Sequence, residues 1–227
     1  MKVLLYILLL VVVVLIAGYK VASYKLIETQ ESMYAEMQNS KGSESPRFFP
    51  DSLKMDDSSF WILINRSKSK FPDAYDKQIQ FLTDTLASMP EERIVGFECT
   101  FVENVVKLWN YNIKSLYQII SGKYISTDDF IYFRCYLISL GKDEFDRAIN
   151  SPELFATIVD PSMWAGEEMM HVADIAYQKR TNKIDEEGCP RCVCTEVSYD
   201  FGSYKMTGEY VSPHDFEDKY PRLTERY

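Results

Sequence analysis

The sequence carries little positive charge and lacks the short motifs that mark several common enzyme classes. Its 227 residues include 34 Asp and Glu against 25 Lys and Arg, which gives a net charge of −9. Broad binding to a phosphate backbone requires a basic face, so we expect no nucleic-acid partner. The chain has no G-x-S-x-G, no P-loop and no dinucleotide-binding fingerprint. These absences weigh against catalysis but do not exclude an enzyme.

Long hydrophobic runs are confined to the N-terminus. Residues Val3–Ala17 form an unbroken apolar run, which Gly18 and Tyr19 extend. A membrane-spanning helix needs about 20 apolar residues, with a lower limit of about 17, and signal-peptide cores are shorter. Because no polar side chain marks an outer face, a buried core helix does not fit. We therefore predict an uncleaved transmembrane anchor over residues 1–23.

Lysines around this run predict its orientation. Lys2 precedes the run, whereas Lys20 and Lys25 follow it. The positive-inside rule then places the C-terminal domain in the cytoplasm, as part of a single-pass membrane protein. In the alternative, residues 1–23 are a signal peptide with a cleavage site near Ala22, and the protein is exported.

The rest of the chain divides into three parts by composition. Residues 24–54 are polar and read as a tether, in which Arg47–Pro50 is expected to fold back onto the domain. Residues 55–183 show helical periodicity, which predicts a compact domain of about seven helices. The last part, residues 184–227, is irregular, with alternation over 193–201 and 204–211 that would suit a small β-hairpin. The predicted fold class is mainly α.

The strongest local pattern is STDDFIYFRCYLISLGKDEFDRAI, from Ser126 to Ile149. Ser126 and Asp129 match a capping box, which indicates the start of a helix. Apolar residues then recur at helical spacing over so much of the circumference that the helix should be central. Gly141 indicates a sharp joint before a second helix.

This stretch resembles the core motif of an uncharacterised bacterial family, domain of unknown function 4240. The resemblance rests on three stretches: DDFIYFRCYLISLGKDEFDRAINSPELF, SSFWILINRSK at 58–68 and FEDKYPRLTERY at the C-terminus. The family often has Gly-Trp where this chain has Cys135-Tyr136. The resemblance implies a small helical domain with no established activity, so it transfers no catalytic residue.

Asp128, Asp129 and Arg134 are the polar residues of the motif and the first candidate ligand site. Two carboxylates at a helix start can bind a cation, or position a ligand against Arg134. Capping of the helix also accounts for both acids, and an internal ion pair accounts for the arginine. We therefore name no catalytic residue and keep these three as ligand-binding candidates.

Cys189, Cys192 and Cys194 in CPRCVC form the second candidate site, for zinc. A C-x-x-C pair supplies two of the four ligands that a structural zinc needs. His171 and His214 lie outside the usual partner spacing. A redox pair is expected beside a βαβ unit, which this sequence does not predict. The alternatives are free thiols, or a disulfide of Cys189 with Cys192 or Cys194.

The total of five cysteines leaves one unpaired in a monomer, which mildly favours a reducing compartment. Taken together, these features predict a membrane-tethered helical domain that binds a protein partner or a small ligand. The competing hypotheses are an enzyme with its site around Asp128, Asp129 and Arg134, and an adaptor stabilised by zinc.

Overall fold

The computed structural model describes residues 2–40, 49–122, 125–155, 166–183, 189–194 and 204–227. Within these ranges the chain is built from helices and contains no strand, which confirms the predicted mainly α fold. The helices are α1 (Lys2–Ser40), α2 (Asp57–Lys70), α3 (Tyr75–Ala87), α4 (Glu91–Lys107), α5 (Tyr111–Ser121), α6 (Thr127–Ser139), α7 (Lys142–Asn150), α8 (Pro152–Phe155), α9 (Glu167–Met170), α10 (Val172–Thr181), α11 (Pro190–Val193), α12 (Phe216–Lys219) and α13 (Pro221–Arg226), with a 3₁₀ turn at Pro213–Asp215.

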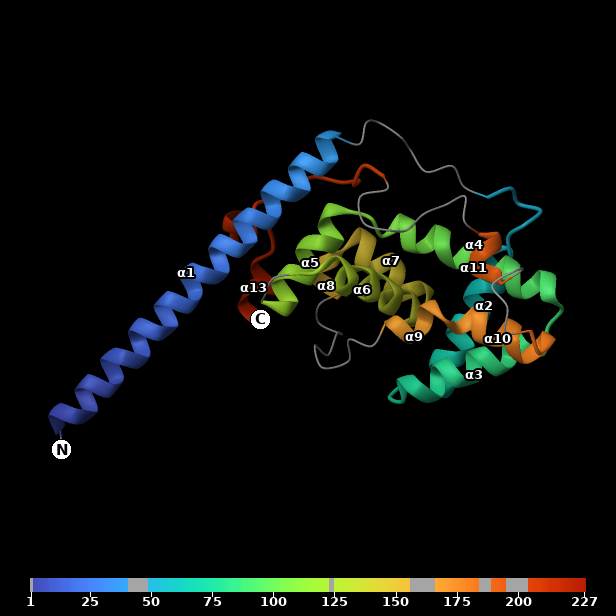
Figure 1. Ribbon diagram of the computed structural model, residues 1–227, viewed down its shortest axis with the longest axis horizontal. Coiled ribbons are helices and arrows are strands. Elements are labelled where there is room, and N and C mark those ends of the chain that lie inside the picture. The colour runs from blue at the N-terminus through green and yellow to red at the C-terminus, as the bar shows by residue number, and fades with distance from the viewer. Residues whose placement is uncertain (1, 41–48, 123–124, 156–165, 184–188, 195–203) are drawn as a thin grey trace.

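The N-terminal part of helix α1 projects beyond the body formed by the other helices, as Figure 1 shows. Farther along, Ile16, Tyr19, Lys20 and Ile27 of α1 line a cavity together with α5 and the C-terminal helices. Over Leu9–Thr29 it is long and apolar enough to cross a membrane, although a signal sequence meets the same criterion. The helix continues to Ser40, so the first part of the predicted tether is helical. The C-terminal helix α13 lies on the side of the body that faces α1.

The expected fold-back after the tether is confirmed at Phe49. Its side chain is 4% exposed and belongs to the core. Its backbone N–H donates to Glu103 Oε1 of α4 at 2.8 Å, and Lys54 Nζ reaches Glu103 Oε2 at 3.3 Å. The chain therefore enters the domain against α4. Arg47 and Phe48 lie outside the described residues.

Helix boundaries follow the residues that the sequence pattern singled out. Asp56 caps α2 by accepting a hydrogen bond from the Ser59 N–H at 2.8 Å. Ser126 and Asp129 form the predicted capping box of α6. Gly141 has φ 101°, a conformation that side chains disfavour, and it joins α6 to α7.

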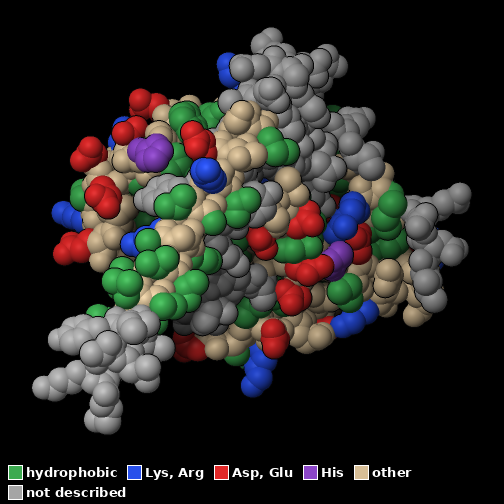
Figure 2. Space-filling model, turned by 60° about the vertical axis from the view of Figure 1, so that its left-hand side comes forward, with side chains coloured by type: hydrophobic (Ala, Val, Ile, Leu, Met, Phe, Trp, Pro, Cys, Tyr) green, Lys and Arg blue, Asp and Glu red, His purple; other side chains and the backbone are tan. Residues whose placement is uncertain are grey.

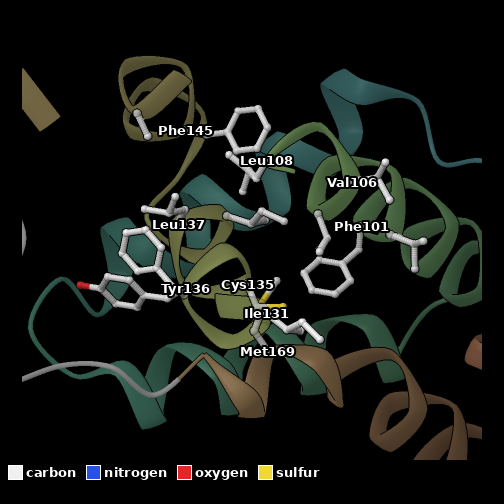
Figure 3. Packing of buried hydrophobic residues seen from close by; sticks show 14 of the residues in the cluster. Phe101, Val106, Leu108, Ile131, Cys135, Tyr136, Leu137, Phe145 and Met169 are labelled. Atoms are coloured by element: carbon white, nitrogen blue, oxygen red, sulfur yellow. The ribbon is translucent and has the colours of Figure 1, made fainter. Parts of the chain in front are cut away.

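Helix α6 is central, as its apolar circumference predicts. Phe130, Phe133 and Leu137 are each no more than 2% exposed. Tyr117 of α5 stacks on Phe133 with ring centroids 4.6 Å apart. Figure 3 shows Cys135 beside Ile131, with Met169 of α9 below them and the side chains of α4 on the other side. Gly166, just before α9, lies so close to Tyr132 that a Cβ there would overlap its carbonyl oxygen.

The predicted β-hairpin is wrong where the structure describes it. Val193 ends helix α11, and residues 195–203 lie outside the described ranges. The following stretch forms only an isolated bridge, between Thr207 and Asn110. Thr207 N donates to the Trp109 carbonyl oxygen at 3.1 Å and its carbonyl accepts from Tyr111 N at 2.9 Å. Thr207 thus uses both of its backbone groups in bonds to the link between α4 and α5, where a hairpin would need them for a second strand.

Candidate functional site

Asp128, Asp129 and Arg134 do not line one open site. Asp128 is exposed on the first turn of α6. Asp129 accepts a hydrogen bond from the Ser126 N–H at 3.4 Å, as part of the capping box. Arg134 points into the domain and is 1% exposed. A ligand on the surface near Asp128 would therefore not reach the guanidinium group.

The Arg134 guanidinium is held by backbone oxygens and aromatic rings. Its Nη1 donates to the Val105 carbonyl oxygen of α4 at 3.2 Å, and its Nε to the Phe130 carbonyl oxygen at 3.4 Å. Its central carbon lies 5.1 Å from the ring centroids of both Trp109 and Phe130, within cation–π range. In this position Arg134 links α4 to α6 and contributes to packing.

The cysteine cluster forms two disulfides. Cys189 bonds to Cys192, which we call the outer disulfide, and Cys194 bonds to Cys99 of α4, which we call the inner disulfide. Cys192 is exposed, whereas Cys99 and Cys194 are 0% and 3% exposed. Among the described residues, no three His, Cys, Asp or Glu side chains are grouped as metal ligands would be. The sequence pattern anticipated the outer bond as one alternative but gave no sign of the inner one.

A partly buried polar centre lies at α11, where α4 and α10 contact it. Arg191 Nε lies 3.5 Å from Asp174 Oδ2, and Arg191 N donates to Asp174 Oδ1 at 3.3 Å. Arg191 Nη2 also donates to the Met170 carbonyl oxygen and lies 3.5 Å from His171 Nδ1. These contacts hold the CPRC segment against α10.

Glu98 of α4 lies close enough to this centre for Asp174 and Arg191 to affect its pKa. It is 1% exposed, and its Oε1 has no hydrogen-bond partner among the described residues. Burial and the neighbouring Asp174 raise the pKa of Glu98 from 4.5 to about 8, against the opposing effect of Arg191. Our sequence analysis missed this residue. The sequence feature that could have revealed it is a single acidic residue among the apolar residues Phe97, Cys99 and Phe101.

Cys135 is the free thiol of the described residues, and it is buried on α6. Burial raises its pKa to about 12, so the thiol stays protonated at neutral pH. Figure 3 shows its sulfur enclosed by apolar side chains. It is therefore a packing residue.

A second place that sequence reasoning missed is an open cavity of about 510 Å³ between α5, α8 and the C-terminal helices. We call it the tail pocket. It is lined by Asn112, Ser151, Pro152, Glu153, Leu154, Lys219, Tyr220 and Arg222. Two stretches that are distant in the sequence, Ser151–Leu154 and Lys219–Arg222, thus meet in one pocket. Both belong to segments that resemble the family motifs.

Hydrogen bonds hold the two sides of the tail pocket together. The Tyr220 hydroxyl donates to Asn112 Oδ1 at 2.9 Å, and Arg222 N donates to Glu153 Oε1 at 3.4 Å. Tyr220 is 4% exposed, and burial raises the pKa of its hydroxyl, which therefore stays neutral. Lys219 Nζ lies 3.4 Å from Glu209 Oε2. Among the described residues, no ion pair involves the Arg222 side chain.

These features define a small all-helical domain that follows an apolar N-terminal helix. The chain belongs to a family of proteins of unknown function, DUF4240, whose sequence profile matches residues 55–179. No curated protein and no solved structure matches the chain.

Proposed function

We propose that this chain is a membrane-tethered binding module, and that the tail pocket binds the anionic group of a small ligand. The observation that carries the proposal is the meeting of Ser151–Leu154 and Lys219–Arg222 around one open cavity. Both stretches are held there by side-chain hydrogen bonds, so the pocket is preformed. A preformed concave site with a few polar groups is the usual form of a ligand site.

The charge of the lining favours an anion. The whole chain is acidic, with a net charge of −9, yet two of the eight residues that line the tail pocket are the cations Lys219 and Arg222. A guanidinium binds carboxylate or phosphate oxygens through two parallel N–H donors. Glu153, the one acid of the lining, already accepts the Arg222 N–H. Asn112 and Ser151 add neutral polar groups beside the cations.

Helix α1 supports the membrane part of the proposal. Among the side chains of its candidate span, Leu9–Thr29, that the structure describes, none is buried. Figure 2, which turns the α1 side of the molecule forward, shows hydrophobic side chains gathered along a projecting part of the surface. Such a surface is stable when lipid covers it.

The two disulfides favour placing the domain on the oxidising, outer side of that membrane. Four of the five cysteines are paired, and such bonds persist in secreted and periplasmic compartments but are rare in the cytosol. The lysines that flank the apolar run Val3–Ala17 predict the opposite side. That bias rests on only two basic residues after the run, Lys20 and Lys25, whereas four cysteines are covalently paired.

The ligand proposal is tested by the thermal stability of the full chain in detergent. We expect sodium phosphate or sodium acetate to raise the melting temperature, relative to sodium chloride at equal ionic strength. An anion at ten times its Kd adds about 1.4 kcal/mol, or about 3–6 °C for a chain of this size.

Arg222→Glu should abolish that shift, whereas Arg226→Glu is the matched control. Arg226 lies on the same helix and does not line the tail pocket. Comparison of the two anions separates a phosphate-bearing from a carboxylate-bearing ligand. The absence of any shift in the unaltered chain, or equal shifts in both variants, would contradict the proposal.

The compartment is tested by trapping thiols in intact cells with acid, followed by denaturation, alkylation and mass spectrometry without reduction. On the oxidising side, Cys99 and Cys194 should stay unmodified while Cys135 is alkylated. A cytoplasmic domain would give alkylated Cys99 and Cys194.

A further inference from the structure

The two disulfides differ in exposure and in the constraint that they impose. The outer disulfide joins residues three positions apart, and the inner disulfide joins residues 95 positions apart. A bond that closes a short loop removes little entropy from the unfolded chain, whereas a long loop removes much more. The outer bond is also the accessible one, because Cys192 is exposed and Cys189 is half-buried.

Helix α11 is held in place without the outer bond. Pro190 is buried, and Arg191 is fixed by Asp174 and by the Met170 carbonyl oxygen. The inner disulfide ties Cys194, directly after the helix, to α4. Opening the bond between Cys189 and Cys192 therefore leaves the segment attached on both the core and the α10 side.

The geometry of the pair distinguishes its two sulfur atoms. Cys189 Sγ accepts a hydrogen bond from the Cys192 N–H at 3.2 Å. Such a bond stabilises negative charge on Cys189 Sγ, which makes this sulfur the better leaving group. Cys192 is the exposed residue of the pair, so an incoming thiolate reaches its sulfur first.

From these observations we propose that the outer disulfide is a thiol–disulfide exchange site, and that its partner is a protein that carries a pair of thiols. A thiolate of the partner attacks Cys192 Sγ, the bond to Cys189 breaks, and its electron pair leaves on Cys189 Sγ. The second partner thiolate then attacks the partner's own sulfur in the mixed disulfide and releases Cys192. The partner gains a disulfide, and the two protons of its thiols pass to Cys189 and Cys192.

The described residues form no βαβ unit, and this chemistry does not require one. Exchange requires an accessible sulfur, a stabilised leaving thiolate and a scaffold that survives opening of the bond. Helix α11 and its contacts meet all three requirements: Cys192 is exposed, its N–H bonds to Cys189 Sγ, and Arg191 and Cys194 hold the segment in place. The site is separate from the tail pocket, which α5, α8 and the C-terminal helices form, so the two proposals stand or fall independently.

The first test equilibrates the full chain in detergent with glutathione buffers of increasing reducing strength, followed by acid quenching, alkylation and mass spectrometry. We expect Cys189 and Cys192 to become alkylated together while Cys99 and Cys194 remain bonded and the melting transition persists. Reduction of both disulfides at the same buffer ratio, or only with loss of the folded state, would overturn the proposal.

The second test measures the reduction of insulin by dithiothreitol in the presence of the chain. Acceleration of about tenfold is expected for the unaltered chain and none for the double variant Cys189→Ala, Cys192→Ala. Removal of the buried thiol by Cys135→Ala is the matched control and should keep the acceleration. Equal rates for the unaltered chain and the double variant would reject exchange.

A third measurement assigns the attacked sulfur. When the oxidised chain is treated with reduced glutathione, quenched in acid and mapped by mass spectrometry, the mixed disulfide should form at Cys192 about tenfold faster than at Cys189. Equal rates at the two positions would contradict the assigned roles.

Discussion

Raising the pH from about 5 to about 8.5 should lower the free energy of unfolding by several kcal/mol, and Glu98→Gln should remove most of that loss. Glu98 is 1% exposed on α4, and its Oε1 has no hydrogen-bond partner among the described residues. Burial, together with the nearby Asp174, raises its pKa to about 8. A buried, unpaired carboxylate is costly, so the folded chain keeps the proton.

The direction of the change in stability follows from the protonation of Glu98 in the folded and the unfolded chain. Below pH 4.5, the ordinary pKa of a glutamate, Glu98 is protonated whether the chain is folded or unfolded. As the pH rises, the unfolded chain loses this proton first, and stability falls until the pH passes the folded pKa of about 8. Because each tenfold difference in proton affinity is worth about 1.4 kcal/mol, the full loss is roughly 5 kcal/mol, of which roughly 4 kcal/mol falls between pH 5 and pH 8.5. Glutamine cannot ionise and escapes it.

The shifted carboxyl groups of Asp56 and Asp84 and the shifted thiol of Cys135 act outside this range. The pKa of Asp56 is lowered by the Ser59 N–H and that of Asp84 by Lys179, so their contributions are lost in acid. Burial raises the pKa of Cys135 to about 12, so its contribution is lost in alkali. The change in the free energy of unfolding between about pH 5 and pH 8.5 should therefore arise mainly from Glu98.

The measurement is denaturant unfolding of the full chain in detergent at several pH values. Glu103→Gln is a matched control on the same helix, because Glu103 is also buried but bonds to Phe49 N and Lys54. This control should lose stability at every pH and keep the slope of the unaltered chain. A Glu98→Gln variant whose stability still falls as steeply with pH would refute the assignment.

Removing the inner disulfide, by Cys99→Ala with Cys194→Ala, should lower the free energy of unfolding by about 2–5 kcal/mol. The bond closes a loop with a sequence separation of 95 residues, and the chain-entropy relation gives about 4.7 kcal/mol for a loop near that length. Both cysteines are buried, so alanine also leaves small voids in the core. The loss should appear as a lower denaturant midpoint without reductant.

The outer disulfide provides the comparison. Its loop spans a separation of three residues, for which the same relation gives about 2 kcal/mol. Cys189→Ala with Cys192→Ala should therefore cost clearly less than removal of the inner pair. An equal or larger loss for the outer pair would show that it is mainly a structural bond.

The helical fold was predictable because its signals are local. Asp56 and Ser126 mark helix starts by capping, Gly141 marks a joint, and apolar spacing marks the inner faces. These effects depend on residues within a turn or two of one another. The stretch around Thr207 was mispredicted because its backbone partner is Trp109, far away in the sequence. Local alternation does not reveal such a partner.

The site residues were predicted less well, for the same reason. Arg134 stands beside two acids in the sequence, but helical geometry turns it inward toward Val105 while Asp128 faces solvent. Cys194 belongs to a tight cluster, yet its partner Cys99 comes from α4. Each half of the tail pocket was visible as a motif. Only the packing of α13 against α5 shows that the halves form one cavity.

Helix α4 holds two segments that are distant from it in the sequence. The segment after α1 reaches the domain at Phe49, whose N–H bonds to Glu103 of α4, and the chain beyond α10 is fastened covalently to Cys99 of the same helix. In the proposed membrane-tethered arrangement, a force on α1 would reach the domain at Phe49, next to the helix that is bonded to Cys194. Helix α4 would then bear both this force and the covalent link to the segment after α10.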